Sequence, residues 1–335
     1  MGEYVAIFDA DFVPPSNFLM RVIPFLVNDP GLGVVQTRWG HLNENQSYLT
    51  GAQALALDKH FTIEQLVRHR AGIYPKFNGA AGVWRKACIE DCGGWHDDTA
   101  CEDLCLSIRA SLRNWRFHYA HDVVAPAELP STILAYKIQQ ARWTLGATQC
   151  LSKYGRRIWE DPLTSRTARV YALLSMSAYV TNALLLSLLL VQWPILIMQI
   201  RPPEWLYLVG LLGLGQPILF ILAQISLYSR WTKRLLFFPA LLTVSIGISP
   251  SNTRALIQAV SRRDFTFSRT PKGSGKSYPV VPGRMLVVES ALFVYTLGAL
   301  LTAVLIGNIG PILLLGSATI GFGYVIYHSL RAKIG

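Results

Sequence analysis

The stretch Gln139-Gln140-Ala141-Arg142-Trp143 lies where this chain of 335 residues changes character. Upstream of it, short runs of strand-forming residues alternate with amphipathic segments and glycine-rich breaks, which is typical of a water-soluble α/β domain. Downstream, after about 25 residues, begin apolar runs that are long enough to cross a bilayer. The sequence therefore predicts an α/β domain that is followed by a bundle of membrane helices.

The composition agrees with a mixed soluble and membrane protein, because 51% of the residues are hydrophobic and only 15% are charged. The formal net charge of +11 is typical of proteins that bind nucleic acid, or of proteins that bind anionic lipid and nucleotide phosphates. The long apolar runs favour the second class. Five cysteines, an odd number, argue against a disulfide framework and indicate reduced thiols.

Two aspartates, Asp9 and Asp11, follow the first predicted strand at residues 4–8. Ligands of open α/β sheets bind at the carboxyl ends of the strands. Two carboxylates placed there can share a hard cation that bridges phosphate oxygens, and an acid-rich turn is the alternative. The strand reads as a buried parallel strand, which needs a neighbour on each side. We therefore expect the natural domain to begin upstream of Met1.

Further elements of the α/β domain follow, and a loop of small residues interrupts them. The predicted helices and strands are at 17–28, 33–37, 47–70 and 115–124. The charged face of helix 47–70 reads as solvated, so we assign no catalytic part to His60 or His69. The loop either forms a tight turn or lets the backbone approach a ligand closely. Its sequence is Phe77-Asn78-Gly79-Ala80-Ala81-Gly82.

A second acidic signal, Glu102-Asp103, opens another predicted helix. Acidic residues in a first turn are favoured by the helix dipole, which by itself can explain the pair. The alternative is a general base that takes a proton from an acceptor hydroxyl. Nearby cysteines form two pairs at a spacing that is atypical of zinc sites, so small buried residues are the favoured interpretation. These are Cys88, Cys92, Cys101 and Cys105.

The opening stretch itself lies on a predicted amphipathic helix at residues 132–152. A helix rich in arginine and tryptophan just before a membrane region can lie along the interface. Trp143 is then either an interfacial anchor or a flat platform on which a sugar ring stacks.

The rest of the chain is predicted to cross the membrane four times, with both ends cytoplasmic by the positive-inside rule. A crossing at the short run 235–249 would put the basic segment 254–284 outside, so we assign 235–262 as re-entrant or interfacial. The basic loop 263–284 then lies on the side of the α/β domain. Its basic and hydroxyl side chains bind either phosphate oxygens or lipid head groups. The predicted spans are 170–199, 205–228, 285–306 and 310–328.

The order of these motifs resembles that of the processive family-2 glycosyltransferases, to which cellulose synthase and hyaluronan synthase belong. The run from Phe77 to Trp95, with Glu128-Leu129-Pro130-Ser131, is most similar to the cellulose-synthase-like mannan and glucan synthases. The motifs are Asp-x-Asp from Asp9, Glu-Asp from Glu102, Gln-Gln-x-Arg-Trp from Gln139 and Phe-x-x-Thr-Pro-Lys from Phe267.

The resemblance covers nearly the whole chain and implies three regions. Residues 1–131 would be the C-terminal part of a GT-A catalytic domain, which is a Rossmann-like α/β sheet. Residues 132–169 would be the interfacial helix and a basic linker, and 170–335 the transmembrane region. The family's first nucleotide-binding strand and a leading span lie upstream of its Asp-x-Asp motif. We therefore expect an N-terminally truncated chain that is inactive unless a missing segment or an oligomer completes it.

The resemblance also implies a role for each motif residue. Asp9 and Asp11 would hold the nucleotide diphosphate through Mg²⁺ or Mn²⁺. Asp103 would be the catalytic base, with Glu102 beside it. The other implied residues are Gln139, Arg142, Thr270 and Lys272 on the donor diphosphate, Trp143 and Asn78 on the acceptor, and Phe267 and Arg269 in a gating loop.

The implied activity is that of a membrane-embedded inverting glycosyltransferase. It would add a hexose from a nucleotide sugar, of the UDP-glucose or GDP-mannose type, to a β-linked polysaccharide and export the product. Its catalytic face would be cytoplasmic, at a plasma or inner membrane or a Golgi equivalent. The alternatives are a non-processive transferase that makes a glycolipid and an inactive fragment that acts as a membrane scaffold. Spans nearly free of ionisable residues argue against a transporter, and basic residues that flank membrane runs argue against nucleic-acid binding.

Overall fold

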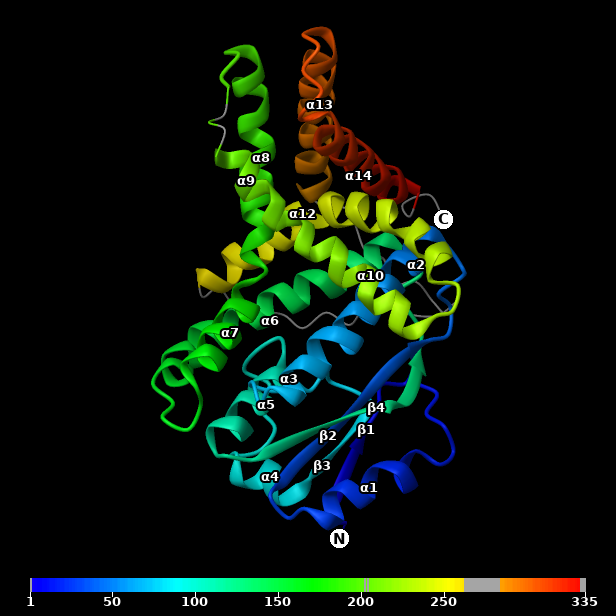
Figure 1. Cartoon of the computed structure of the whole chain (residues 1–335), viewed down its shortest axis with the longest axis vertical. Coiled ribbons are helices and arrows are strands. Elements are labelled where there is room, and N and C mark those ends of the chain that lie inside the picture. Colours follow the sequence, from blue (N-terminus) through cyan, green and yellow to red (C-terminus); the bar gives the residue numbers. More distant parts are fainter. Residues whose placement is uncertain (1, 202, 204, 262–283, 332–335) are drawn as a thin grey trace.

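The computed structural model describes residues 2–201, 203, 205–261 and 284–331. The predicted gating loop, with Phe267, Arg269, Thr270 and Lys272, lies outside the described residues. Within them, a sheet domain lies at one end of the molecule and long apolar helices lie at the other (Figure 1). Helix α6 (Ile133–Trp159) lies between the two parts and carries the Gln-Gln-Ala-Arg-Trp stretch.

The domain is built on a mixed four-stranded sheet in the order β1-β3-β2-β4. Strand β3 (Gly82–Arg85) runs antiparallel to β1 (Tyr4–Ile7) and β2 (Leu32–His41), whereas β2 and β4 (Arg116–Ala127) are parallel. The α/β prediction is confirmed, but that of a buried parallel strand at 4–8 is wrong. In the described sheet β1 lies at an edge, and Val5 is 37% exposed. The apolar character of residues 4–8 does not reveal the direction of the neighbouring strand.

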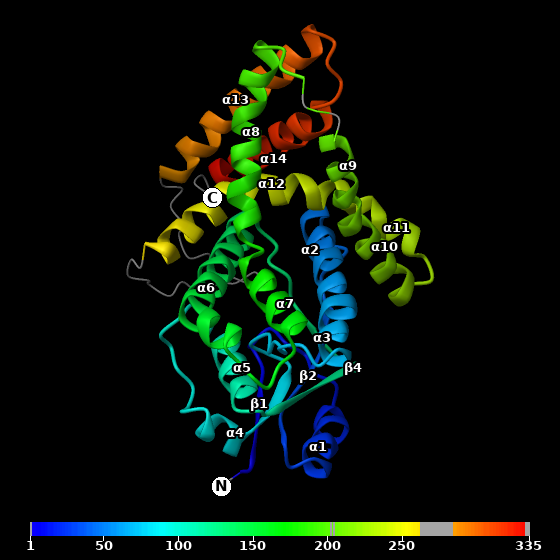
Figure 2. The same cartoon turned by 60° about the vertical axis from the view of Figure 1, so that its left-hand side comes forward.

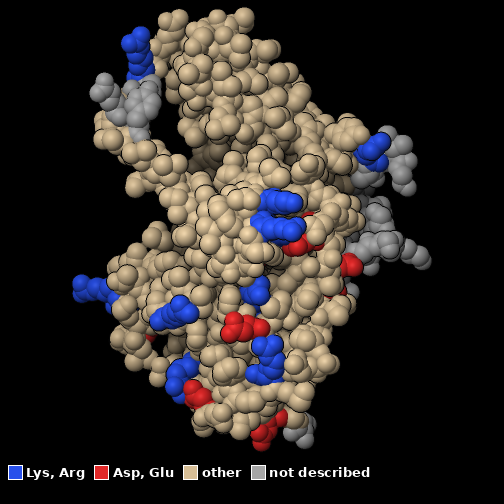
Figure 3. Space-filling model, turned by 45° about the vertical axis from the view of Figure 1, so that its right-hand side comes forward, with Lys and Arg blue, Asp and Glu red and all other residues tan. Residues whose placement is uncertain are grey.

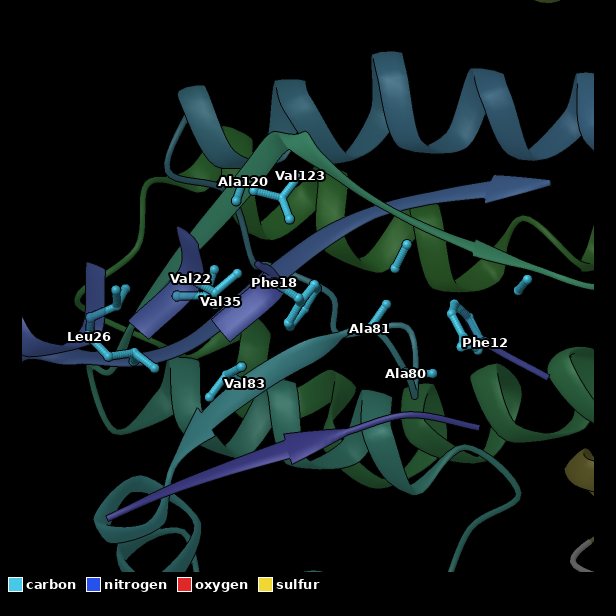
Figure 4. Packing of buried hydrophobic residues seen from close by; sticks show 13 residues of the cluster. Phe12, Phe18, Val22, Leu26, Val35, Ala80, Ala81, Val83, Ala120 and Val123 are labelled. Carbon is cyan, nitrogen blue, oxygen red and sulfur yellow. The ribbon is translucent and has the colours of Figure 1, made fainter. Parts of the chain in front are cut away.

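Helix α1 (Phe18–Asn28) covers one face of this sheet and buries a narrow apolar stripe. Phe18, Val22 and Leu26 recur every four residues, so their side chains lie on one side of the helix. They pack with Val35 of β2 and Val83 of β3 in the cluster shown in Figure 4. Full burial of each such side chain contributes roughly 1.5–3 kcal/mol.

A nearly continuous helix connects the sheet to the membrane helices. It comprises α2 (Tyr48–Lys59), a π-helical turn η1 (His60–Gln65) and α3 (Leu66–Arg70), which agrees with the helix predicted at 47–70. Ser47 and Thr50 form a reciprocal capping box at its start. The helices α4 (Lys86–Asp91) and α5 (Glu102–Leu112) complete the domain.

The remaining helices include, among the described residues, five that are long and apolar enough to cross a membrane. They lie within α8, the α9–α10 segment, the α11–α12 segment, α13 and α14 (Figures 1 and 2). On the face shown in Figure 3, charged side chains are spread over the sheet domain and are sparse over the helices above it. The bounds are α7 Arg166–Ser177, α8 Val180–Ile197, α9 Trp205–Leu211, η2 Leu212–Leu214, α10 Gly215–Leu227, α11 Trp231–Arg234, η3 Leu235–Phe237, α12 Phe238–Val260, α13 Arg284–Leu305 and α14 Ile312–Arg331.

The structure divides the span predicted at 170–199. Residues 170–177 belong to α7, whose small and apolar side chains Ala172 and Met176 pack against Tyr154 and Ile158 of α6. Only α8 has the length and composition of a span in this region. Helix α12 lies across the lower ends of α8 and α13 (Figures 1 and 2) and packs against the middle of α14, where Gly247 meets the backbone of Gly321. The interfacial assignment of residues 235–262 stays a prediction.

Candidate active site

One cavity of about 260 Å³ brings together residues from three separate sequence motifs. Asn78 comes from the small-residue loop, Asp103 from the start of α5, and Gln139 and Trp143 from α6. The cavity lies between the sheet domain and the membrane helices, because Tyr179, just before α8, and Phe220 of α10 also line it. Side chains that are 25 to 65 positions apart in sequence therefore face one small volume, as a catalytic site requires.

The carboxylate of Asp103 lies in the first turn of α5 at the wall of this cavity. Burial raises the pKa of Asp103 to about 6, and the neighbouring Glu102 carboxylate acts in the same direction. The positive charges of Lys76 and Arg142 act in the opposite direction. A carboxylate with a pKa this close to neutrality is a stronger base than an ordinary aspartate and is still ionised at pH 7.

The backbone of the small-residue loop lies directly against Asp103. A methyl group added at Gly79 would lie only 3.3 Å from Asp103 Oδ2, and Gly79 has a φ of +86°. Both the conformation and the space therefore require glycine. The positive φ of Gly79 fits a tight turn that packs against Asp103. Close approach of this loop to a ligand stays a prediction.

Helix α6 is held against the loop before Asp103 by a second close contact. Its first turn is capped by Thr132, whose side chain accepts from Ala135 N. Further along, a methyl group at Gly146 would lie 2.4 Å from Cys101 Sγ. The glycine lets the helix and the loop touch. This contact fixes where Trp143 stands relative to Asp103.

Asp9 and Asp11 follow β1 and do not line the cavity. The residue after Asp11 is Phe12, whose ring is 5.2 Å from that of Trp39, which does line the cavity. The role predicted for Asp9 and Asp11 stays a prediction.

The Asp9 and Asp11 pair also bears on metal binding. Within the described ranges, no group of three or more His, Cys, Asp or Glu side chains could hold a metal ion. Two hard carboxylates fit Mg²⁺ or Mn²⁺ when ligand phosphates and water complete the shell, because Mg²⁺ usually takes only one or two protein carboxylates. These residues therefore fit such a cation in the presence of a nucleotide.

The cysteines behave as small buried residues. Cys88, Cys92 and Cys105 are buried, and Cys101 is half-buried. The sulfur of Cys105 lies 2.6 Å from that of Cys150 on α6, not beside Cys88 or Cys92. Burial and hydrogen bonding account for all four side chains.

The prediction that His60 lies on a solvated face is wrong. His60 and Glu64 of the π-helical turn η1 line the cavity together with Lys59, the last residue of α2. His69 is outside it and contacts His118. Helical periodicity could not separate the two histidines, because a π-helical turn changes the direction of every later side chain and has no recognisable sequence pattern.

The model of one family, described as glycosyl transferase family group 2, matches residues 4–305. The chain belongs to this glycosyltransferase family. The resemblance drawn from the motifs is thereby confirmed, as is a GT-A-like mixed sheet followed by apolar helices.

Relatives of this family-2 chain are known from plants. It is 47% identical over 163 residues to a probable glucomannan 4-beta-mannosyltransferase 11 of Oryza sativa subsp. japonica, covering 49% of this chain and 29% of the relative. It is 44% identical over 173 residues to glucomannan 4-beta-mannosyltransferase 2 of Arabidopsis thaliana, covering 52% and 32%. The chain thus spans about a third of the length of these relatives.

A solved structure also resembles the family-2 chain in outline. It is the mannosyltransferase PcManGT from Pyrobaculum calidifontis in complex with GDP-Man and Mn²⁺. The TM-score is 0.40 at 17% sequence identity, over 79% of this chain and 64% of that chain. With five apolar helices of spanning length among its described residues, and with its family, the present chain is a membrane protein.

Proposed function

We propose that this family-2 chain contributes the acceptor side and the catalytic base of an inverting β-mannosyltransferase. The donor would be GDP-mannose, and the product would be a β-1,4-linked mannan or glucomannan. The plant relatives, named as glucomannan 4-beta-mannosyltransferases, favour mannose over glucose. The observation that carries the proposal is the cavity in which Asp103, Trp143, Gln139 and Asn78 meet.

In the proposed reaction, Asp103 takes the proton of the acceptor hydroxyl. The hydroxyl oxygen forms a bond to the anomeric carbon of mannose as the bond from that carbon to the diphosphate breaks. Charge develops on the leaving diphosphate, and Lys76 and Arg142, whose positive charges lower the pKa of Asp103, would stabilise it. A divalent cation on Asp9 and Asp11 would supply further charge neutralisation.

The acceptor would lie between α6 and η1. The indole of Trp143 offers an apolar face for the terminal sugar ring, and Gln139 and Asn78 offer amide groups for its hydroxyls. Tyr179 and Phe220 line the part of the cavity nearest the apolar helices, so the preceding sugars would leave toward the membrane. We propose the predicted roles of Thr270 and Lys272 on the donor and of Phe267 and Arg269 in gating on the family resemblance alone.

The proposed orientation places the cavity on the cytoplasmic side. Arg156, Arg157, Arg166 and Arg169 lie at the end of α6 and in α7, just before the first apolar helix α8. By the positive-inside rule such a cluster stays in the cytoplasm.

The Asp103→Asn variant tests the proposal. Protein that contains this chain together with a donor-binding segment is purified in lipid nanodiscs and incubated with radiolabelled GDP-mannose, Mn²⁺ and β-1,4-linked mannotetraose, and the products are sized. We expect transfer to fall by about 10²–10⁴-fold, because the amide cannot accept the proton, while donor binding is retained. Transfer that survives in Asp103→Asn would exclude Asp103 as the base. Labelled glycolipid without lengthened oligosaccharide would favour the non-processive alternative.

A further inference from the structure

A series of directed hydrogen bonds joins His60, Glu64 and Asn78 of the cavity wall to Gln65 behind it. His60 Nδ1 lies 2.8 Å from Glu64 Oε2, and His60 Nε2 lies 2.9 Å from Asn78 Nδ2. Gln65 Nε2 donates to Asn78 Oδ1 at 2.6 Å. The π-helical turn η1 supplies three of these side chains, and the small-residue loop supplies Asn78. None of the motifs that led to the family assignment includes His60, Glu64 or Gln65.

The partners fix the direction of each bond. A carboxylate only accepts, so Nδ1 of His60 carries the hydrogen and donates it to Glu64. In the neutral ring Nε2 is then an acceptor and takes one hydrogen of the Asn78 amide. Burial lowers the pKa of His60, which keeps the ring neutral at pH 7. Asn78 therefore has one orientation, with its oxygen toward Gln65 and its nitrogen toward His60.

The hydrogen-bond series is anchored to the membrane helices at the end that lies away from Asn78. Glu64 Oε1 pairs with Lys59 at 2.8 Å, and Lys59 also donates to Gln216 of α10 at 3.1 Å. Burial acts to raise the pKa of Glu64, but the hydrogen bonds from His60 and Lys59 and the positive charge of Lys59 act against it, and that pKa lies well below its usual value. Glu64 thus remains an anion that holds the His60 ring in place.

The orientation of Asn78 matters because of its neighbour. The backbone of Gly79 lies against Asp103, and the second hydrogen of the Asn78 amide is left for a ligand in the cavity. We propose that His60 is a positioning residue that aims this hydrogen at a sugar hydroxyl beside the one that faces Asp103, an inference that rests on the proposed function. The hexose at the acceptor end is thereby held with its reacting hydroxyl toward the base.

The test is a double-mutant cycle on the full chain in lipid nanodiscs, with β-1,4-linked mannotetraose as acceptor. His60→Ala and Asn78→Ala should each lower kcat/KM for the acceptor by about tenfold, the loss expected for one positioned hydrogen bond. The KM for GDP-mannose should stay within about twofold. Because His60 acts through Asn78, the double variant should be no worse than Asn78→Ala alone.

Matched variants separate positioning from folding. His60→Gln keeps an acceptor near Nε2 and should recover acceptor kcat/KM to within about threefold. His69→Ala removes a histidine from the adjoining helix that does not line the cavity and should leave acceptor kcat/KM unchanged. Multiplied losses in the double variant, no recovery in His60→Gln, or a loss confined to the donor would each overturn the inference.

The inference and the proposed function can fail separately. If the unsubstituted chain transfers mannose and His60→Ala equals it, only the inference is wrong. If the unsubstituted protein shows no transfer even with a donor-binding segment present, the proposed function fails. The cycle is then read from mannotetraose binding by calorimetry, where equal affinities of the His60→Ala and unsubstituted chains would overturn the inference as well.

Discussion

Asp103 and Glu64 are two carboxylates of one cavity whose surroundings move their pKa values in opposite directions. Burial and Glu102 raise that of Asp103, whereas the contacts of Glu64 with His60 and Lys59 lower its pKa. Such a separation usually marks an acid–base group and a fixed charge. The separation of the two pKa values supports the proposal that Asp103 is the base and that Glu64 is a fixed negative charge in the cavity wall.

The raised pKa of Asp103 predicts a pH profile. A base must be deprotonated, so kcat/KM should be constant above pH 7 and should fall tenfold per pH unit below about 6. The measurement is the initial rate of mannose transfer between pH 5 and 8. An acid limb near pH 4, where an unperturbed aspartate titrates, would contradict the assignment.

The raised pKa of Asp103 also predicts that a variant without this carboxylate is more stable at neutral pH. A carboxylate whose pKa is raised by folding destabilises the fold at neutral pH, and the penalty disappears as pH falls below the folded pKa. Asp103→Asn should therefore stabilise the protein at pH 7 by up to about 3 kcal/mol and by much less at pH 4. Thermal unfolding at the two pH values measures the difference. An equal stabilisation at the two pH values would mean that folding does not raise the pKa of Asp103.

Gly79 offers a test of the contact between the small-residue loop and Asp103. Gly79→Ala should cost about 1 kcal/mol of stability because of the positive φ and should also lower the transfer rate, since its methyl group would crowd Asp103 Oδ2. Gly72→Ala is the control: Gly72 has a φ of +61° and no atom within 4 Å of the added methyl. If both variants lose the same share of activity, contact with Asp103 has no part in the effect.

At the scale of elements, an ion-pair network joins α2 to the membrane helices. Asp58, almost wholly buried, accepts from His41 of β2, Gln224 of α10 and Arg234 of α11. Burial acts to raise the pKa of Asp58, but His41, Gln224 and Arg234 together hold it below its usual value. The network fixes α10, and with it Phe220, against the domain that carries Asp103.

Removing the charge of Asp58 should therefore loosen this junction. Asp58→Asn leaves the Arg234 guanidinium partly unpaired in a buried site and should cost about 3 kcal/mol of stability. The readout is thermal unfolding in nanodiscs. Asp122→Asn, at a side chain that is 95% exposed, should change the stability by less than about 0.5 kcal/mol. Equal shifts for the two variants would show that the network does not hold the parts together.

The positions of helices and strands were easier to predict from the sequence than the segments that they pack against. Sequence patterns located helices α1, α2 and α6 and the strands β1, β2 and β4, and α1 and α6 bury stripes whose spacing is written in the sequence. The short strand β3 was not predicted. The antiparallel partner of β1, the break between α7 and α8 and the π-helical turn depend on contacts with distant segments. Local patterns contain no information on these, so His60 and Glu64 were missed.

At the scale of the whole molecule, the sequence motifs predicted only some of the residues that line the cavity. Asp103, Gln139, Trp143 and Asn78 line one cavity, as the family motifs suggest. Lys59, Lys76 and Trp39 belong to no motif, and they reach the cavity only because the sheet domain and the helices pack around it. The roles of all these residues, and the division at 1–131, 132–169 and 170–335, stay predictions.

The proposed membrane orientation has its own test at this scale. Arg157→Cys lies before α8 and Gln199→Cys lies just after it. A membrane-impermeant thiol reagent should label Arg157→Cys from the cytoplasmic side and Gln199→Cys from the opposite side. The unsubstituted chain controls for its own cysteines, four of which are buried. Labelling of both variants from one side would exclude a crossing by α8.

Tyr179 and Phe220 form part of the cavity although they belong to the helical half. Grafting the sheet domain of one relative onto the helices of another would therefore exchange only some of the surfaces that a substrate meets. A soluble fragment engineered to end ahead of α6 would retain Asp103 but lack the indole and both of these aromatic rings. Inhibitor screens and specificity swaps for this enzyme type accordingly need lipid-embedded protein that includes the helices.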